Sequence, residues 1–348
     1  MIKTGATLEL GQEYPPPGEE ADIQQIEQMI RQQLEHDYQS GVRPARRDQH
    51  PKAHGCVKAE FIVDDNLPDQ LRYGVFKEPR TYPAWIRYSS SSVQMKPDTQ
   101  KDAHGMSIKL LGVEGEKVLE DEKNEMTQDF ILANNKVFFV RNTADYVVFI
   151  SAFSQGKLMS FFFGWNPFKW RLHELKNMLS ATQKSVANPL QIQYWSQTPY
   201  KLGSNAIKFS AKPRSAKIDP MPGSPGPDFL QEAMARQLKT EDVYFDFLVQ
   251  LQTDPVKMPI EDATIVWDES LSPFQKVGTI HIPVQTFDSP AQIEFAENLS
   301  FTPWHTLPEH RPLGNTNRVR RKVYETVSKL RHQLNNARRQ EPTGHEVF

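Results

Sequence analysis

Apolar residues recur every three or four positions in two segments, residues 22–38 and residues 309–332. This spacing predicts amphipathic helices that each bury one face. The apolar positions are Ile23, Ile26, Ile30 and Leu34 in the first helix, and Val319, Val323, Val327, Leu330 and Leu334 in the second. Gly314 precedes the second helix as a turn residue, and Asn315 or Thr316 is its expected N-cap.

The region between these helices alternates between apolar and polar residues, with Gly, Pro and Asp separating the segments. A period of two predicts strands. The predicted strands are residues 56–63, 84–92, 106–113, 136–142, 192–198, 206–212, 243–253, 263–269 and 277–287. Residues 145–185 interrupt them with an aromatic-rich helical section, and residues 1–20, with three consecutive prolines, are expected to form an extended arm. The pattern predicts an α+β fold, a large antiparallel β-barrel with peripheral helices, as a single domain over residues 1–348.

Composition excludes several classes of protein. The chain has 348 residues and a net charge of -2, so no global positive field indicates nucleic acid as a partner. Cys56 is the single cysteine, which excludes an intramolecular disulfide. Neither a signal peptide nor an apolar run long enough to span a membrane is evident. We therefore expect a cytoplasmic protein.

Four polar clusters are candidates for chemistry. A histidine at the entrance of a strand suits a general acid or base, because its pKa lies near neutral pH. Zinc binding by a histidine pair four residues apart is disfavoured, because Pro51 and Gly55 oppose a helix there. The clusters are RDQHPKAHG (residues 47–55), IRYSSSS (residues 86–92), ANNKVFFVRN (residues 133–142) and the pair Arg320 and Tyr324.

Arg320 and Tyr324 lie one turn apart on one face of the predicted C-terminal helix, and Arg331 follows seven residues later. A guanidinium keeps its proton, so a neighbouring guanidinium stabilises a phenolate. Tyrosine is one of the few side chains that bind haem iron axially. Taken alone, the same motif also fits a solvated basic helix with a half-buried tyrosine.

Taken together and in chain order, these clusters resemble the haem catalase superfamily. The resemblance is closer to its short branch, which is similar to catalase-related peroxidases and allene oxide synthase domains. HRPLG (residues 310–314) and YWSQTPYKLG (residues 194–203) also resemble that branch. The matching residues are Arg47, Asp48, Gln49, His50, Pro51 and Lys52; Arg87, Tyr88 and Ser89; DAHGMSIKL (residues 102–110); Asn134, Asn135, Phe138, Phe139 and Arg141; and Arg320, Tyr324 and Arg331.

The resemblance implies a haem, of the b type, buried between the barrel and the C-terminal helix. Tyr324 would be the axial ligand of the haem iron, with Arg320 holding it as phenolate. His50 would move the peroxide proton, Asn134 would orient the peroxide, and Ser89 would hold the imidazole tautomer. The residues expected to pair with the haem propionates are Arg47, Arg87 and Arg331. Aromatics on the distal face are expected at Tyr146 and Phe149, whose alternative is ordinary core packing.

Some positions leave alternatives open. Asn135 is the second choice to Asn134, and His54 is the second choice to His50. Gln49 stands where the family usually has a small branched residue, so the pocket would be more polar. This departure weakens the expectation of efficient hydrogen peroxide disproportionation but not that of haem binding.

The predicted function is that of a haem peroxidase that cleaves or rearranges the O–O bond of organic or fatty acid hydroperoxides, or of hydrogen peroxide. The alternatives are a haem carrier or sensor without turnover, and a barrel that binds lipid without haem. The aromatic residues around 159–170 have two explanations. They pack on the barrel or on another subunit, and the second case would make the protein a homo-oligomer. Alternatively, they form an apolar mouth that admits a lipid hydroperoxide or rests peripherally on a membrane.

Overall fold

The computed structural model describes residues 8–348, and the first seven residues of the predicted arm lie outside the described part. Eight strands form a closed antiparallel barrel, because β5 pairs with both β4 and β7 at the two ends of one continuous sheet. The short β6 extends this sheet as a hairpin with β7. The strands are β1 (Ala53–Val63), β2 (Thr81–Ser90), β3 (His104–Leu111), β4 (Thr127–Ala133), β5 (Tyr194–Trp195), β6 (Tyr200–Leu202), β7 (Asn205–Pro213), β8 (Val243–Leu251) and β9 (Gln275–Ile282).

The barrel interior is filled by side chains that alternate along its strands. In β8, Phe245 and Phe247 are fully buried, while Tyr244 before them is exposed and Asp246 between them is partly exposed. The rings of Phe61 and Phe130 lie 5.0 Å and 5.1 Å from the ring of Phe247. Aromatic pairs at these separations contribute beyond the area they bury. The barrel is therefore a packed core and not a channel.

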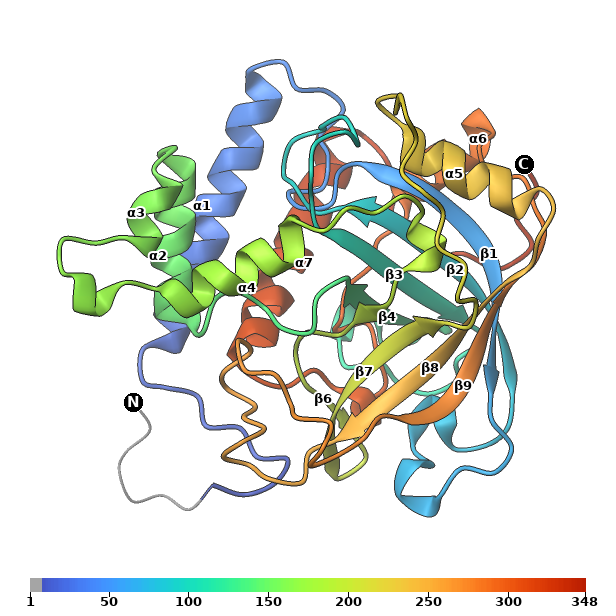
Figure 1. The fold of residues 1–348 in the computed structure, drawn as a ribbon, viewed down its shortest axis with the longest axis horizontal. Coiled ribbons are helices and arrows are strands. Elements are labelled where there is room, and N and C mark those ends of the chain that lie inside the picture. The colour runs from blue at the N-terminus through green and yellow to red at the C-terminus, as the bar shows by residue number, and fades with distance from the viewer. Residues whose placement is uncertain (1–7) are drawn as a thin grey trace.

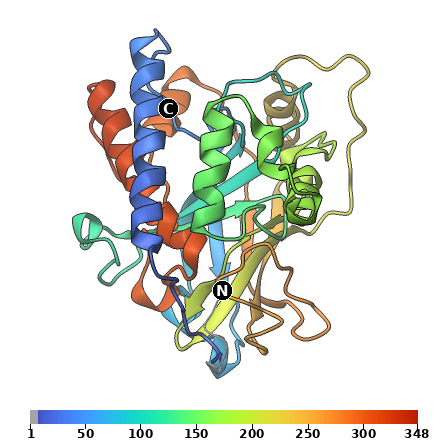
Figure 2. The same cartoon turned by 90° about the vertical axis from the view of Figure 1, so that its left-hand side faces the viewer.

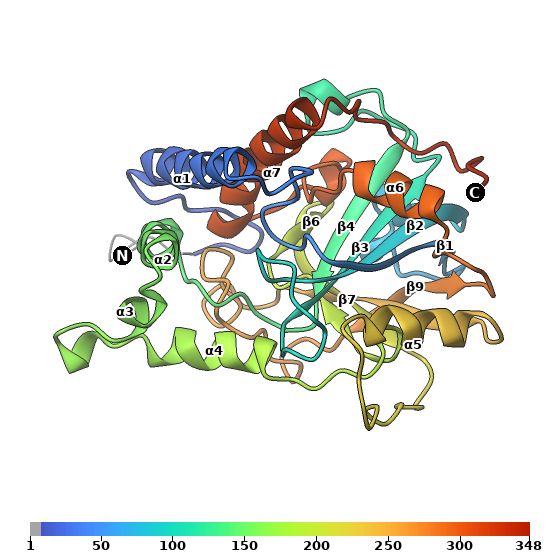
Figure 3. The ribbon, with the colours of Figure 1, turned by 90° about the horizontal axis from the view of Figure 1, so that it is seen from above.

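The helices lie outside the barrel, most of them on one side (Figure 1). Seen from that side, α1 stands between α7 and α2, and it packs against both (Figure 2). Helices α5 and α6 both contact β1 (Figure 3). The described helices are α1 (Glu19–Gln39), α2 (Thr143–Ser154), α3 (Leu158–Phe162), α4 (Leu172–Thr182), α5 (Phe229–Leu238), α6 (Pro290–Asn298) and α7 (Asn315–Leu334).

Two predicted strands are wrong. Residues 136–142 and 263–269 form no strand, although Val137, Phe138 and Ala263 are buried. Phe138 N donates to Ala263 O at 3.0 Å, so the two segments meet without a ladder. Their apolar residues pack between the barrel and the helices, which produces an alternating pattern without a sheet.

Four further elements were not predicted, namely strands β4 and β6 and helices α5 and α6. Strand β4 contains buried polar residues that obscure its pattern, since Gln128 accepts from Leu307 N and Asp129 pairs with Lys109 at 2.7 Å. Helices α5 and α6 are each only ten or nine residues long, too short for a clear period. The expected cap of the C-terminal helix is also wrong. Gly314, with φ 85°, occupies the N-cap position of α7.

Helix α7 is fixed by carboxylates at its N-terminal end. Arg318 pairs with Glu13 from the arm at 2.6 Å, with Glu19 from α1 at 2.6 Å and with Glu261 at 2.7 Å. These pairs raise the pKa of the Arg318 guanidinium. The basic residues of this helix are therefore partly engaged by the protein's own carboxylates.

Candidate functional site

The register of the sheet brings the predicted distal residues to one rim of the barrel. Antiparallel pairing puts the start of β1, the end of β2, the start of β3 and the end of β4 at the same edge. Ala53 faces Ser89, Ser89 faces Gly105, and Gly105 faces Ala133. His50 precedes β1, and Asn134 follows β4, so both flank this row.

His50 is held in an uncommon conformation against this rim. Its φ is 62°, in the left-handed region that residues other than glycine seldom adopt, and such strain clusters at functional sites. Its Nδ1 lies 3.0 Å from Ser89 Oγ, and its carbonyl accepts from Arg87 Nη2 at 2.8 Å. A Cβ on Gly105 would lie 2.7 Å from His50 Cε1, so only glycine leaves room for the imidazole.

The imidazole of His50 is neutral at physiological pH. Burial, followed by the charge of Arg87, lowers its pKa to about 3. The residue nevertheless keeps part of its surface accessible. A neutral imidazole with one nitrogen bonded to Ser89 has its other nitrogen available as a base.

His54, the second choice, lies in a different environment. Its Nε2 is 2.9 Å from Ser90 Oγ, and its Nδ1 is 3.7 Å from Asp98 Oδ1. The side chain is buried, and burial lowers its pKa well below the ordinary range. These contacts are typical of a structural histidine in the core.

The two asparagines of the loop after β4 are distinguished by their partners. Asn135 donates to Val137 O at 3.0 Å and accepts from Ser180 Oγ at 3.3 Å. Asn134 Oδ1 accepts from His104 N at 3.0 Å, while its Nδ2 is buried without a partner among the described residues. Because His104 N can only donate, the orientation of the Asn134 amide is fixed and its free group is a donor. The geometry favours Asn134 over Asn135.

Three guanidinium groups, those of Arg47, Arg87 and Arg331, converge near Glu297 of α6. Arg47 Nη1 lies 2.9 Å and Arg331 Nη1 lies 3.5 Å from the Glu297 carboxylate. Burial lowers the pKa of Arg87 to about 9 and that of Arg331 to about 9, and Arg47 adds to both shifts. The Nε atoms of Arg87 and Arg331 are buried without hydrogen-bond partners in the described chain. This cluster has positive charge and free donors for a further carboxylate.

Tyr324 lies on α7 and is half-buried. Arg320 donates to Thr198 Oγ1 at 3.2 Å and to Asn317 Oδ1 at 3.4 Å. No hydrogen bond joins Arg320 to the Tyr324 phenol among residues 8–348. The expected stabilisation of a phenolate by Arg320 therefore stays a prediction.

Tyr146 and Phe149 lie on α2 and are buried within the helical core. Burial raises the pKa of Tyr146, and the charges of Asp48, Arg320 and Tyr324 are close enough to contribute. The Phe149 ring lies 4.7 Å from that of Phe139. Tyr146 therefore lies near Arg320 and Tyr324 of α7, whereas the burial of Phe149 is explained by ordinary core packing.

Two residues near the candidate site, Tyr200 and Glu297, were not predicted from the sequence. The Tyr200 hydroxyl is buried without a partner in the described chain, and burial raises its pKa to about 12, with Arg320 and Tyr324 among the neighbouring charges. Glu297 neutralises part of the positive charge of the arginine cluster. Tyr200 belongs to the YWSQTPYKLG match, which was a usable signal, whereas nothing around Glu297 in the sequence indicates its role.

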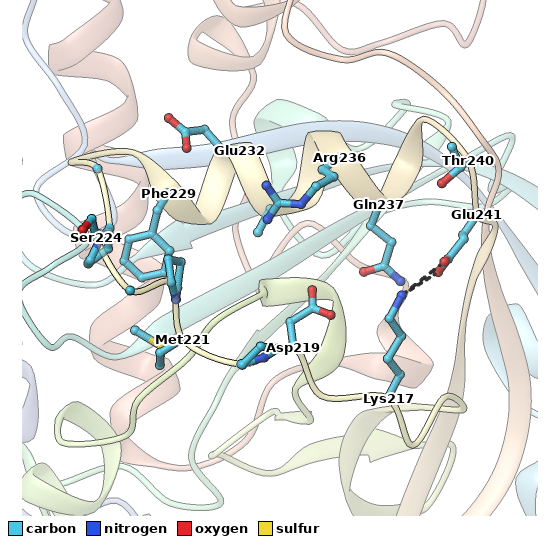
Figure 4. Close-up of a pocket in the computed structure, with 16 residues that line it drawn as sticks. Lys217, Asp219, Met221, Ser224, Phe229, Glu232, Arg236, Gln237, Thr240 and Glu241 are labelled. Atoms are coloured by element: carbon cyan, nitrogen blue, oxygen red, sulfur yellow. Dashed lines mark hydrogen bonds and ion pairs between the residues drawn. The ribbon is translucent and has the colours of Figure 1, made fainter.

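A separate surface cavity lies beneath the proline-rich loop 217–226 and α5 (Figure 4). Three of its charged groups have partners, since Lys217 pairs with Glu241 at 3.2 Å and Asp219 accepts from Asn188 at 3.2 Å. Hydrogen bonds from Asn188 and Gln191 outweigh burial and lower the pKa of Asp219. The cavity contains no acid–base pair or activated nucleophile, so we assign no chemistry to it.

Comparison with solved structures identifies the architecture. The chain aligns with catalase A from Saccharomyces cerevisiae at a TM-score of 0.65 and 18% identity, over 100% of this chain and 72% of that one. It has a catalase-like fold. A fungal catalase aligns at a TM-score of 0.62 and 17% identity, over 100% of this chain and 70% of that one.

A bacterial catalase aligns at a TM-score of 0.61 and 16% identity, over 91% of this chain. This chain spans 65% of the length of that catalase. No protein-family model and no curated protein matches the sequence. The catalase-like fold therefore agrees with the predicted antiparallel barrel, and the short branch of the superfamily stays a prediction.

The residues at the rim are compatible with a haem. The arginine cluster offers free donors for carboxylates, the Asn134 amide offers a free donor, and Tyr324 offers a half-buried phenol on α7. A haem presents two carboxylates and one metal ion, which these groups match. Among the described residues, no helix is both long and apolar enough to cross a membrane.

Proposed function

We propose that this protein is a haem-dependent peroxidase that cleaves or rearranges the O–O bond of a hydroperoxide. The observation that supports this most directly is the row at one barrel rim, where a strained, neutral His50 contacts Ser89 beside the free amide donor of Asn134. A bound haem would supply a Lewis-acidic iron centre that can give up the two electrons needed to reduce the O–O bond. Tyr324 would hold the iron, and Arg47, Arg87 and Arg331 would hold the propionates.

The protein's own residues would manage the proton and the orientation of the peroxide. His50 would accept the hydroperoxide proton at the ring nitrogen not bonded to Ser89 and return it to the departing oxygen. Ser89 fixes the imidazole at its Nδ1, 3.0 Å away. Asn134 Nδ2 would donate to a peroxide oxygen and favour the charge that develops there. The preferred substrate class is organic or fatty acid hydroperoxides, with hydrogen peroxide second.

The alternative is a haem carrier or sensor without turnover. A carrier needs the axial ligand and the arginine cluster but gains nothing from a strained histidine at the rim. The φ of 62° at His50 therefore favours catalysis over simple storage.

The deciding experiment compares three variants after haem loading. Tyr324→Phe should lose the absorption spectrum of a phenolate-ligated iron. His50→Ala should keep that spectrum and lose about 100-fold or more of its hydroperoxide turnover, the range expected for a general base. His345→Gln, at an exposed histidine, is the matched control and should retain both.

The outcomes separate the hypotheses. Absence of a haem spectrum in the wild-type protein would exclude both the peroxidase and the haem carrier or sensor. Haem binding with equal turnover in wild type and His50→Ala would favour the carrier. A screen of hydrogen peroxide against fatty acid hydroperoxides, with products identified, then assigns the substrate.

A further inference from the structure

A short segment between α3 and α4 projects from the molecule on the side away from the barrel, and both Figure 1 and Figure 3 show it as the outermost part there. We call residues 163–172 the aromatic tip. Trp165 is 104% exposed and Phe168 is 99% exposed, so both rings stand entirely in solvent. Single exposed apolar residues are ordinary, but these two rings have exposed neighbours in Met159, Trp170 and Leu172.

The tip is a defined turn that displays its rings. Phe161 and Phe162, at its base, are fully buried. The Trp170 indole N–H donates to Gly164 O at 2.9 Å, and Asn166 Oδ1 accepts from Phe168 N at 3.0 Å. These bonds hold the backbone between the two exposed rings, so their exposure follows from the fold.

The charged side chains of residues 146–173 are all positive. No aspartate or glutamate occurs from residue 146 to residue 173, and Glu174, which follows, is buried. Lys157, Lys169 and Lys176, which are close to the two rings in the sequence, are exposed. Arg171 is excluded from this set because it pairs with Asp145 at 2.8 Å.

Exposed tryptophan and phenylalanine beside lysines are typical of surfaces that enter the headgroup region of anionic membranes. The rings partition into the interface, and the lysines are attracted to the negative surface. A second copy of the chain fits less well. In a twofold dimer the same patch meets itself, so the lysines of one copy would face those of the other across segments, residues 146–173, that contain no aspartate or glutamate.

We propose that the aromatic tip is a docking site for an anionic phospholipid bilayer. Trp165 and Phe168 enter the headgroup region, and Lys157 and Lys169 contact the anionic lipids. The inference is independent of haem, because it rests only on the surface of the tip.

The test measures binding of the full chain to vesicles of phosphatidylcholine with 40% phosphatidylglycerol, and to vesicles of phosphatidylcholine alone, by co-sedimentation. The wild-type protein should bind the anionic vesicles, with weaker binding at high salt. Trp165→Ser/Phe168→Ser should bind at least tenfold more weakly. Ile218→Ser/Val256→Ser, which removes two exposed apolar side chains elsewhere, is the matched control and should bind as the wild type does.

Lys157→Gln/Lys169→Gln separates the two contributions and should weaken binding mainly at low salt. Lack of wild-type binding to anionic vesicles would overturn the proposal, and so would equal binding by the serine variant. Concentration-dependent self-association that the serine substitutions abolish, without vesicle binding, would instead assign the tip to a contact between copies of this chain.

Discussion

Replacing Glu297 with glutamine tests whether the arginine cluster is built around a carboxylate. The substitution keeps the shape of the side chain but removes the negative charge that faces Arg47 at 2.9 Å and Arg331 at 3.5 Å. At an effective dielectric constant of about 20, each of these pairs is worth roughly 5 kcal/mol of Coulomb energy before desolvation is subtracted. Arg87, fully buried nearby, would also lose a neutralising charge.

The net effect is smaller than these Coulomb energies. Removing one partner of a buried ion pair typically costs about 3–5 kcal/mol, because the remaining charge stays buried without compensation. The Glu297 side chain is 26% exposed, so water screens part of the loss. We therefore expect Glu297→Gln to lower the free energy of unfolding by about 3 kcal/mol.

Urea denaturation of the haem-free protein measures this loss, and Glu294→Gln, at an exposed carboxylate on the same helix, is the control. Haem should then reduce the difference, because its propionates would replace the missing carboxylate. Equal stability of the Glu297 and Glu294 variants would refute the view that Glu297 neutralises the cluster. A loss that haem leaves unchanged would argue against the cluster as the propionate site.

Three further predictions follow from buried groups. Gly105→Ala should lower peroxide turnover at least tenfold without unfolding the protein, because its Cβ would displace the His50 imidazole; Gly223→Ala, with open space around its Cβ, should have no effect on turnover. Lys109→Met should cost about 3–5 kcal/mol in urea unfolding, because Lys109 is fully buried between Asp129 and Glu341; a loss below 1 kcal/mol would contradict this. Burial lowers the pKa of His104 to about 4 and that of His310 to about 3, so both imidazoles stay neutral in the folded protein. The stability that depends on their neutral forms is complete above pH 6.5 and is lost as the pH falls toward 4. Stability in urea should then fall by roughly 2 kcal/mol per histidine between pH 7 and pH 5, whereas a pH-independent midpoint would show that neither is constrained to be neutral.

The sequence was informative where one physical rule dominated. The strands of the barrel with one buried face show a clear period of two, and α1 and α7 show a clear helical stripe, so these elements were predicted. Residues 136–142 were wrongly predicted as a strand, because a segment packed between a barrel and a helical layer also alternates between buried and exposed residues. Strand β4 was missed because its polar residues Gln128 and Asp129 are buried and satisfied by distant partners, which no local pattern reveals.

Some residues of the candidate site were likewise predicted from the sequence, whereas others were found only in the structure. Chain-order motifs brought His50, Ser89 and Asn134 together before any contact was known, and the register of β1–β4 places all three at one rim. The choice between Asn134 and Asn135 needed the hydrogen bonds, because adjacent asparagines are equivalent in sequence. Glu297 could not have been found, since its role depends on α6 meeting three arginines from distant parts of the chain.

The aromatic tip and the proposed active site lead to a joint prediction about how substrate is presented. Phe161, at the base of the tip, lies 5.4 Å from Phe149 on α2, and Phe149 lies 4.7 Å from Phe139, which follows the asparagine loop in the sequence. An apolar side-chain path therefore connects the lipid-facing surface to the helix next to α7. If the proposed function holds, Trp165→Ser/Phe168→Ser should lower turnover of a fatty acid hydroperoxide embedded in anionic vesicles at least tenfold, because the protein no longer meets the bilayer.

The same variant should keep wild-type turnover of a small water-soluble hydroperoxide, since neither ring contacts His50 or Ser89. Ile218→Ser/Val256→Ser controls for the loss of apolar surface and should keep both activities. Equal losses on both substrates would mean that the tip supports the fold of α2 and α3, not delivery from the membrane. If the wild-type protein binds vesicles but the serine substitutions change turnover of neither substrate, the docking site stands. The hydroperoxide would then reach the protein from water, because the bilayer would hold the protein without supplying the substrate.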